Sequence, residues 1–182
     1  MSERFVVIDT ETNWENEVMS IGIILSSDDR FIPIDYKYII IPEAAEVGGI
    51  YQNSLLIGNT IPDYLNRYLA ISYVEEFLQK HNTNKIFAYN APFDLHCLPE
   101  LGIYDWHDIL RIAAYIQHNP AIPKDAECFS TGRLKRGYSV GDIMYFFGEH
   151  NYTEQHNALI DAVDELRMMK YLNHPICYYP SL

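Results

Sequence analysis

The stretch Phe5-Val6-Val7-Ile8-Asp9-Thr10-Glu11 places two carboxylates directly after an apolar run. The run predicts a buried strand, and successive side chains of a strand point to opposite faces. Asp9 and Glu11 are therefore expected to point the same way. Two like charges held together are unfavourable unless a positive group lies between them, and a hard divalent cation prefers oxygen ligands. The stretch thus predicts a strand that ends in a metal site.

The rest of the chain predicts an α/β fold around this first strand. Apolar runs at 18–25 and 30–41 predict two further strands, which would form an antiparallel meander with residues 5–8. Alternating helices and strands are expected after the meander, so the sheet should be mixed. The expected helices are 62–81, 92–101, 109–118, 140–147 and 158–172, and the expected short strands are 85–89 and 105–108.

Length and composition narrow the classes of protein. The 182 residues are expected to form one domain, 1–182, and 48% of them are hydrophobic. The formal net charge of -12 argues against binding of duplex nucleic acid through a broad basic face. No run approaches the roughly 20 apolar residues of a membrane span, so no membrane partner is expected. Three cysteines and no visible signal peptide lead us to expect a cytoplasmic protein with reduced thiols.

Two further acidic signals follow the first. Asp94 ends the segment Asn90-Ala91-Pro92-Phe93-Asp94, near the start of an expected helix, where a carboxylate is favoured. Asp161 lies early on the last expected helix, and His156 precedes it by five residues. A helix carboxylate beside a loop histidine can supply a metal ligand and a general base. We therefore expect both segments to join the site at Asp9 and Glu11.

Taken in this order and at this spacing, the three segments resemble the motifs of the DEDDh 3′→5′ exonucleases. This group includes the proofreading subunit of bacterial replicases, RNase T and oligoribonuclease. Its motifs Asp-x-Glu, Asn-x-x-Phe-Asp and His-x-Ala-x-x-Asp-Ala are matched by Asp9 and Glu11, by Asn90, Phe93 and Asp94, and by His156, Ala158, Asp161 and Ala162. The related subclass with a catalytic tyrosine would place it at Asn157, so the histidine subclass fits.

The resemblance implies an RNase-H-like three-layer sandwich and a two-metal mechanism. Asp9, Glu11, Asp94 and Asp161 would hold two divalent cations, Mg²⁺ or Mn²⁺, and His156 would act as general base. The partner would be single-stranded nucleic acid, DNA or short RNA, with a free 3′ end. Cleavage there would release nucleoside monophosphates.

Several other residues are candidates for substrate contact. Thr10, Thr12, Asn90 and Phe93 flank the proposed ligands. Trp14 is expected either to stack on a base or to be a partly buried packing anchor, and the sequence favours neither. The cluster of Arg133, Lys135 and Arg136 would either contact phosphates at the rim of the site or form a solvated loop. Asp164 and Glu165 are expected on a solvated helix face.

Other functions remain open at this point. The chain departs from the family pattern at Thr12-Asn13-Trp14, where a glycine is frequent, and at Tyr89, where a histidine is frequent. Both positions bear on the substrate pocket. The alternatives are a phosphoesterase acting on small nucleotides, a proofreading subunit that works with a polymerase partner, and an inactive nucleic-acid-binding module.

Overall fold

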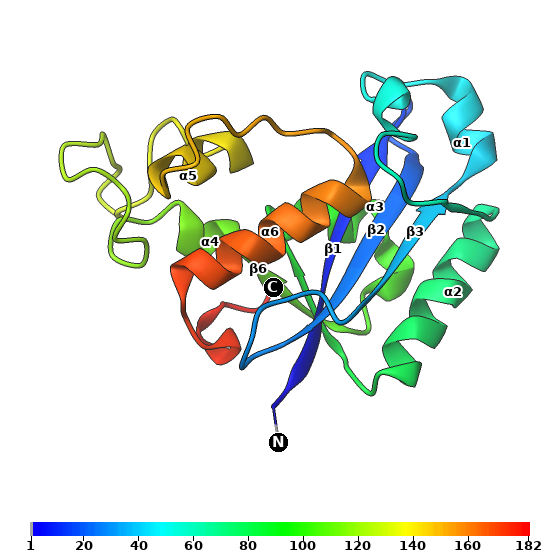
Figure 1. Ribbon diagram of the computed structural model, residues 1–182, viewed down its shortest axis with the longest axis horizontal. Helices are drawn as coiled ribbons and strands as arrows, with labels where there is room; N and C mark the ends of the chain where they lie inside the picture. The colour runs from blue at the N-terminus through cyan, green and yellow to red at the C-terminus, as the bar shows by residue number, and fades with distance from the viewer. Residues whose placement is uncertain (1) are drawn as a thin grey trace.

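The apolar run Phe5–Ile8 lies in a central, buried strand of a mixed sheet in the computed structural model, which describes residues 2–182 (Figure 1). The strands are β1 (Arg4–Thr12), β2 (Val18–Ser27), β3 (Asp35–Ile40), β4 (Asp63–Tyr64), β5 (Lys85–Ala88) and β6 (Asp105–Asp108). The helices are α1 (Pro42–Val47), α2 (Arg67–Lys80), α3 (Ala91–Cys97), α4 (Leu110–Ala113), α5 (Val140–Phe146) and α6 (Ala158–Leu172). Short 3-10 turns are η1 (Gln52–Ser54), η2 (Pro99–Leu101) and η3 (Ile176–Tyr178).

The strand order is β4-β3-β2-β1-β5-β6. The pairs β1–β2 and β2–β3 are antiparallel, which confirms the predicted meander. The pairs β1–β5, β5–β6 and β3–β4 are parallel, so the sheet is mixed, as expected. Because β1 and β5 run in the same direction, their carboxyl ends meet at one edge of the sheet, where ligands bind in open α/β sheets.

Side-chain alternation along the strands shows that helices cover both faces of the sheet. On β1, Asp9 and Glu11 face the start of α6. Thr10, which lies between them in the sequence, points to the other face and donates a hydrogen bond to Asp94 of α3. On β3, Tyr38 faces the α6 side through Asn157, whereas Lys37 contacts Tyr73 of α2. Helix α6 therefore lies on one face, and α2 and α3 on the other, so the three-layer prediction is confirmed (Figure 1).

The helix expected over 62–81 begins later than predicted. Residues Asp63 and Tyr64 instead form β4 and pair with Ile39 and Ile40 of β3. Asn66 then caps α2, because its side chain accepts the backbone N–H of Leu69. Pro62 thus precedes a short edge strand and does not open the helix.

The helix expected over 109–118 is also much shorter. Only Leu110–Ala113 is helical, because the chain then pairs with a segment about 20 residues away that no local pattern reveals. The backbone N–H of Ile116 donates to Gly132, and that of Leu134 donates to Ala114. These bonds compete with the helical ones and end α4.

Two more boundaries differ from the prediction. The strand expected over 30–41 is confined to Asp35–Ile40, since Phe31 adopts a left-handed φ of 50° in the turn before it. The helix expected over 92–101 ends at Cys97 and continues as the 3-10 turn Pro99–Leu101. None of the helices within residues 2–182 combines the length and the apolar character that crossing a bilayer requires.

Candidate metal-dependent active site

The two carboxylates of β1 lie where the strand leaves the sheet. Asp9 is paired with Gly22 of β2, and the register shifts by a bulge between Glu11 and Thr12. Bulges at strand ends re-aim side chains and end the pairing. Glu11 is only 6% exposed although it lies at the end of the strand. Both carboxylates thus face the space beside α6, as the alternation predicts.

Helix α6 reaches this space because β2 offers no side chain under its first turn. A Cβ added at Gly22 would lie 2.1 Å from the carbonyl oxygen of Ala158. Asn157 caps the helix: its side chain accepts the N–H of Ile160, and its own N–H donates to Asp161 at 3.0 Å. This reciprocal arrangement fixes Asp161 next to the end of β1.

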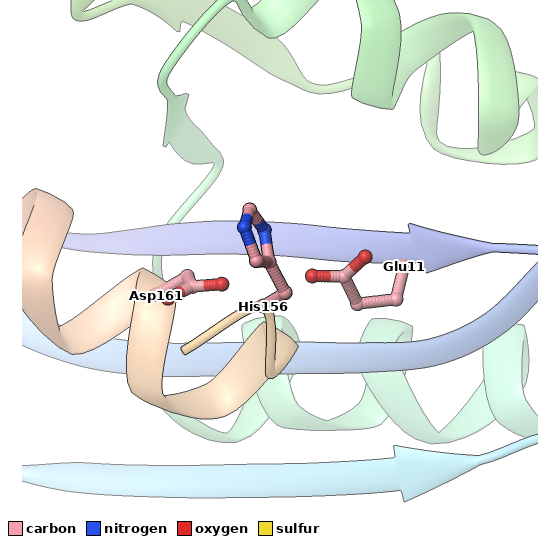
Figure 2. A group of neighbouring side chains, drawn as sticks. All are labelled: Glu11, His156 and Asp161. Carbon is pink, nitrogen blue, oxygen red and sulfur yellow. The ribbon is translucent and has the colours of Figure 1, made fainter. Parts of the chain in front are cut away.

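His156 joins Glu11 and Asp161 in one tight group. One ligand atom from each lies within 4.8 Å of the other two. Figure 2 shows that the three side chains come from β1, from the segment before α6 and from the first turn of α6. His156 adopts a left-handed φ of 52°, a conformation that a non-glycine residue keeps only where its surroundings hold it. The site thus contains both candidate ligands and a candidate base.

Asp94 approaches from the other face of the sheet. It is buried in the first turn of α3, which follows β5, and the hydroxyl of Thr10 donates to its carboxylate at 2.8 Å. Asn90 precedes α3 with a left-handed φ of 63° and is exposed. The hydroxyl of Thr10, expected to contact substrate, is thus used to orient Asp94.

Burial and mutual repulsion raise the pKa of the carboxyl groups near α6. The pKa of Glu11 rises to about 8, first by burial and then by the charges of Asp161 and Glu154. The pKa of Asp161 rises to about 7 by burial and by the charges of Glu154 and Asp164. A bound cation would favour the ionised form of both groups and so lower each pKa.

The pKa of the other two carboxyl groups, those of Asp9 and Asp94, is also raised. Burial raises the pKa of Asp9 well above its ordinary value, and the charges of Glu165, Asp94 and Asp161 add to the effect. Burial raises the pKa of Asp94 to about 7, although the hydrogen bond from Thr10 opposes the shift. All four carboxyl groups of the predicted set are therefore electrostatically linked, and Glu11, Asp161 and His156 form the tightest group.

Two unpartnered oxygen atoms test whether this set fits a metal. Oδ2 of Asp9 and Oδ1 of Asp161 are buried and have no hydrogen-bond partner among the described residues. A buried carboxylate oxygen without a partner is unfavourable unless something else binds it. Oxygen ligands in this number and charge suit hard divalent cations. The residues therefore fit either Mg²⁺ or Mn²⁺.

The expectation that Asp164 and Glu165 lie on a solvated helix face is wrong. Glu165 is 2% exposed, and its carboxylate accepts the backbone N–H of Tyr89 at 3.0 Å. Asp164 is also buried and forms an ion pair with Arg167 at 3.0 Å. Glu165 follows Asp161 by four residues and so shares its face of α6, which is the signal that could have revealed it.

A cavity of about 430 Å³ opens over the carboxylates. Besides Asp9, Glu11, His156 and Asp161, its walls include the predicted Thr10, Thr12, Trp14 and Phe93, and also Glu154 and Tyr51, which the sequence did not single out. Trp14 is 65% exposed and Phe93 is 43% exposed. Trp14 is therefore not a buried packing anchor. The side chains of Trp14 and Phe93 both line the cavity and are exposed to solvent.

The basic cluster lies apart from the walls of this cavity. Arg133 stacks over the ring of Tyr138 at 4.8 Å, and Arg136 pairs with Glu127 at 3.5 Å on an exposed surface. The hydroxyl of Tyr89 donates to the carbonyl of Tyr138, which ties this segment to the end of β5. Phosphate contact by Arg133, Lys135 and Arg136 stays a prediction.

Comparisons with known proteins give a fold but no sequence relative. No protein-family description matches the sequence, and no curated protein matches it significantly. The nuclease domain of 3′hExo, a DEDDh family member bound to rAMP, is similar with a TM-score of 0.62 and 11% identity, over 100% of this chain and 96% of that one.

Two further solved structures are similar. A 3′-exonuclease in the 3′-end-specific recognition of a histone mRNA stem-loop matches with a TM-score of 0.65 and 10% identity, over 100% of this chain and 71% of that one. A full-length 3′-exonuclease matches with a TM-score of 0.58 and 11% identity, over 92% of this chain and 80% of that one. At such identities the likeness establishes the fold, RNase-H-like and mixed α/β.

Proposed function

We propose that the protein is a metal-dependent 3′→5′ exonuclease acting on single-stranded DNA or short RNA. The observation that carries this proposal is the tight group of Glu11, His156 and Asp161. Asp9 and Asp94 lie close enough to this group for their charges to interact with it. The fold is shared with 3′-exonucleases, two of whose structures are described with a nucleotide or a histone mRNA stem-loop. The cavity over the carboxylates is open and flanked by exposed aromatic rings, as a single strand requires.

Each residue has a distinct part in the proposed reaction. Asp9, Glu11, Asp94 and Asp161 would hold two divalent cations, Mg²⁺ or Mn²⁺. When bound, these ions would promote ionisation of water and offset charge on the phosphate oxygens. A ring nitrogen of His156 would take the proton from the attacking water. The new P–O bond forms as the P–O3′ bond breaks, and the departing O3′ takes a proton from solvent, which leaves a nucleoside monophosphate and a free 3′-hydroxyl.

The same site is compatible with two other activities of the same chemistry. One is a phosphoesterase that acts on small nucleotides, because the cavity of about 430 Å³ is large enough for one nucleotide. The other is a proofreading subunit that acts beside a polymerase. An inactive binding module is disfavoured, because all four carboxylates and the histidine are present and gathered.

The decisive experiment is digestion of 5′-labelled single-stranded DNA and RNA oligomers with Mg²⁺ or Mn²⁺. A ladder shortening from the 3′ end is expected, and Asp9→Asn should nearly abolish it. Asp125→Asn, at an exposed aspartate remote from the cavity, is the matched control and should keep full activity. Mn²⁺ binding, followed by paramagnetic resonance, should weaken in Asp9→Asn alone. Full activity in excess chelator would exclude the metal mechanism, and cleavage of mononucleotide esters but not oligomers would select the phosphoesterase.

A further inference from the structure

Tyr51 stacks on His156 inside the cavity. The two ring centroids are 3.8 Å apart, and the ring planes differ by 12°. Tyr51 comes from the irregular segment between α1 and β4, far from His156 in the sequence. Nothing in the motifs of the sequence points to this tyrosine.

The segment that carries Tyr51 is fixed to the residue next to His156. The side-chain amide of Asn157 donates to the carbonyl oxygens of Ser54 at 2.8 Å and Leu55 at 3.3 Å. The hydroxyl of Tyr38 also donates to Leu55, at 2.6 Å, and the N–H of Ser54 donates to Tyr51 at 3.0 Å. These hydrogen bonds therefore fix the position of Tyr51 relative to the cap of α6. The stack is not a chance contact of two mobile loops.

No hydrogen bond of the described residues orients the imidazole of His156. Among the hydrogen bonds formed by residues 2–182, none involves a ring nitrogen of His156. Histidines at metal sites are usually oriented by a hydrogen bond to the second nitrogen. Here the flat face of Tyr51 packs against the imidazole, and rotation of the imidazole about its Cβ–Cγ bond would break this stack. Both ring nitrogens stay available to a proton or a ligand.

Tyr51 also belongs to the reactive centre and not to the core behind it. Burial raises the pKa of Tyr51, and the nearby charges of Glu11, Glu154 and Asp161 raise it further. It lines the same cavity as the proposed ligands and is only partly buried. A residue in this place either orients the base of the reaction or touches the substrate.

We propose that Tyr51 is a positioning residue whose ring holds the imidazole of His156 over Glu11 and Asp161 for proton transfer. The inference rests on the proposed nuclease function. Loss of the ring frees the imidazole to turn away from the attacking water. Proton transfer depends steeply on orientation, so kcat falls while binding of the oligomer is unchanged.

The kinetic test compares three variants on a single-stranded oligomer. Tyr51→Ala is expected to lower kcat by about 10–100-fold with KM unchanged. Tyr51→Phe keeps the aromatic face and should recover most of kcat. Tyr68→Ala, at a tyrosine that is 79% exposed on α2, controls for the loss of a ring and should match the wild type. A raised KM with normal kcat would overturn the inference and make Tyr51 a substrate contact.

A double-mutant cycle shows whether the effect passes through His156. In a His156→Ala background, Tyr51→Ala should lower kcat no further, because the group that it orients is gone. Equal losses in both backgrounds would overturn the inference. Circular dichroism of each variant should be that of the wild type, and Mn²⁺ binding should be unchanged in Tyr51→Ala.

A measurement without turnover separates this inference from the proposed function. The tyrosine face should shift the imidazole C–H proton resonances of His156 upfield, and His156→Ala identifies them. Tyr51→Ala should remove the shift and Tyr51→Phe should keep it. If the shift is absent, the inference fails while nuclease activity can stand. If the shift is present but the wild type cleaves no nucleic acid with any divalent metal, the proposed function fails.

Discussion

Gly22 of β2 lies under Ala158 at the start of α6, so closely that a Cβ on the glycine would be 2.1 Å from the alanine carbonyl oxygen. Gly22 is also the strand partner of Asp9. The missing side chain therefore brings two parts of the site together: the end of β1 and the turn that carries His156 and Asp161.

We expect Gly22→Ala to damage the site more than the fold. The new methyl group must push α6 away from β2, and overpacking of this kind costs about 1–3 kcal/mol. Metal binding and nuclease activity should fall more steeply than the melting temperature, because Asp161 moves with the helix. Gly141→Ala in α5 is the matched control, since its Cβ would have its nearest neighbour at 3.9 Å. Equal activity of the two variants would show that α6 adapts without moving Asp161.

The stability of the metal-free protein should fall as the pH rises. In the folded state the pKa of Asp161 and Asp94 is about 7 and that of Glu11 about 8, all above their ordinary values near 4. The folded state therefore holds these protons more tightly than the unfolded state does. The resulting stability is complete below about pH 4 and is lost as the pH passes through about 7 to 8.

Melting temperature measured in excess chelator between pH 5 and 9 checks this expectation. The decline should become shallower in Asp161→Asn, which removes one of the repelling charges, and should largely disappear on addition of Mg²⁺ or Mn²⁺. A flat profile in chelator would mean that the carboxylates are compensated by the protein itself.

His156→Ala should lower kcat by about 10²–10⁴-fold, the usual contribution of a general base. Oligomer affinity should be little changed, because the carboxylates remain. His150→Ala removes an exposed histidine of the same loop and serves as the control. The measurement is the single-turnover cleavage rate, and an unaltered rate in His156→Ala would assign the proton acceptor elsewhere.

Trp14→Ala should weaken binding of a single strand by about 1–3 kcal/mol, if the exposed indole stacks on a base. The effect should be similar for all four bases, since each has a π-face, and Trp14→Phe should restore part of the affinity. The melting temperature should hardly change, because the side chain is 65% exposed. Fluorescence anisotropy with homopolymers gives the affinities. Unchanged affinity with reduced thermal stability would contradict stacking.

The triple change of Arg133, Lys135 and Arg136 to Ala should lower affinity for single strands. Each bound phosphate contributes about 0.7 to the salt slope, so removal of three cationic side chains should flatten the slope by at most about 2. The rate at saturating substrate should change far less, because the carboxylates and His156 remain. Affinity against salt concentration is the measurement, with Lys170→Ala on α6 as the control for an exposed lysine. If the plots of affinity against salt concentration coincide for the variant and the wild type, the cluster is a solvated loop and contacts no phosphate.

The sequence by itself determined the central strand, the meander and the carboxylates that gather at its end. Local rules suffice for these features: alternation places Asp9 and Glu11 on one face, and parallel strands bring the segment of Asp94 to the same edge. The helix boundaries near 62 and 118 were wrong because partners distant in sequence, β3 and residues 132–134, competed for the same backbone groups.

Only the tertiary structure decided the surroundings of that site. The four-residue spacing places Glu165 on the face of Asp161, but only the packing of α6 on β1 and the N–H of Tyr89, which donates to its carboxylate, show that this face is buried. Gly22 matters because a helix more than 100 residues later packs on it. Tyr51 matters because hydrogen bonds from the cap of α6 hold its segment against His156. The physical reason is common to all three: ligand types follow from local chemistry, but burial and contact follow from which distant surfaces pack together.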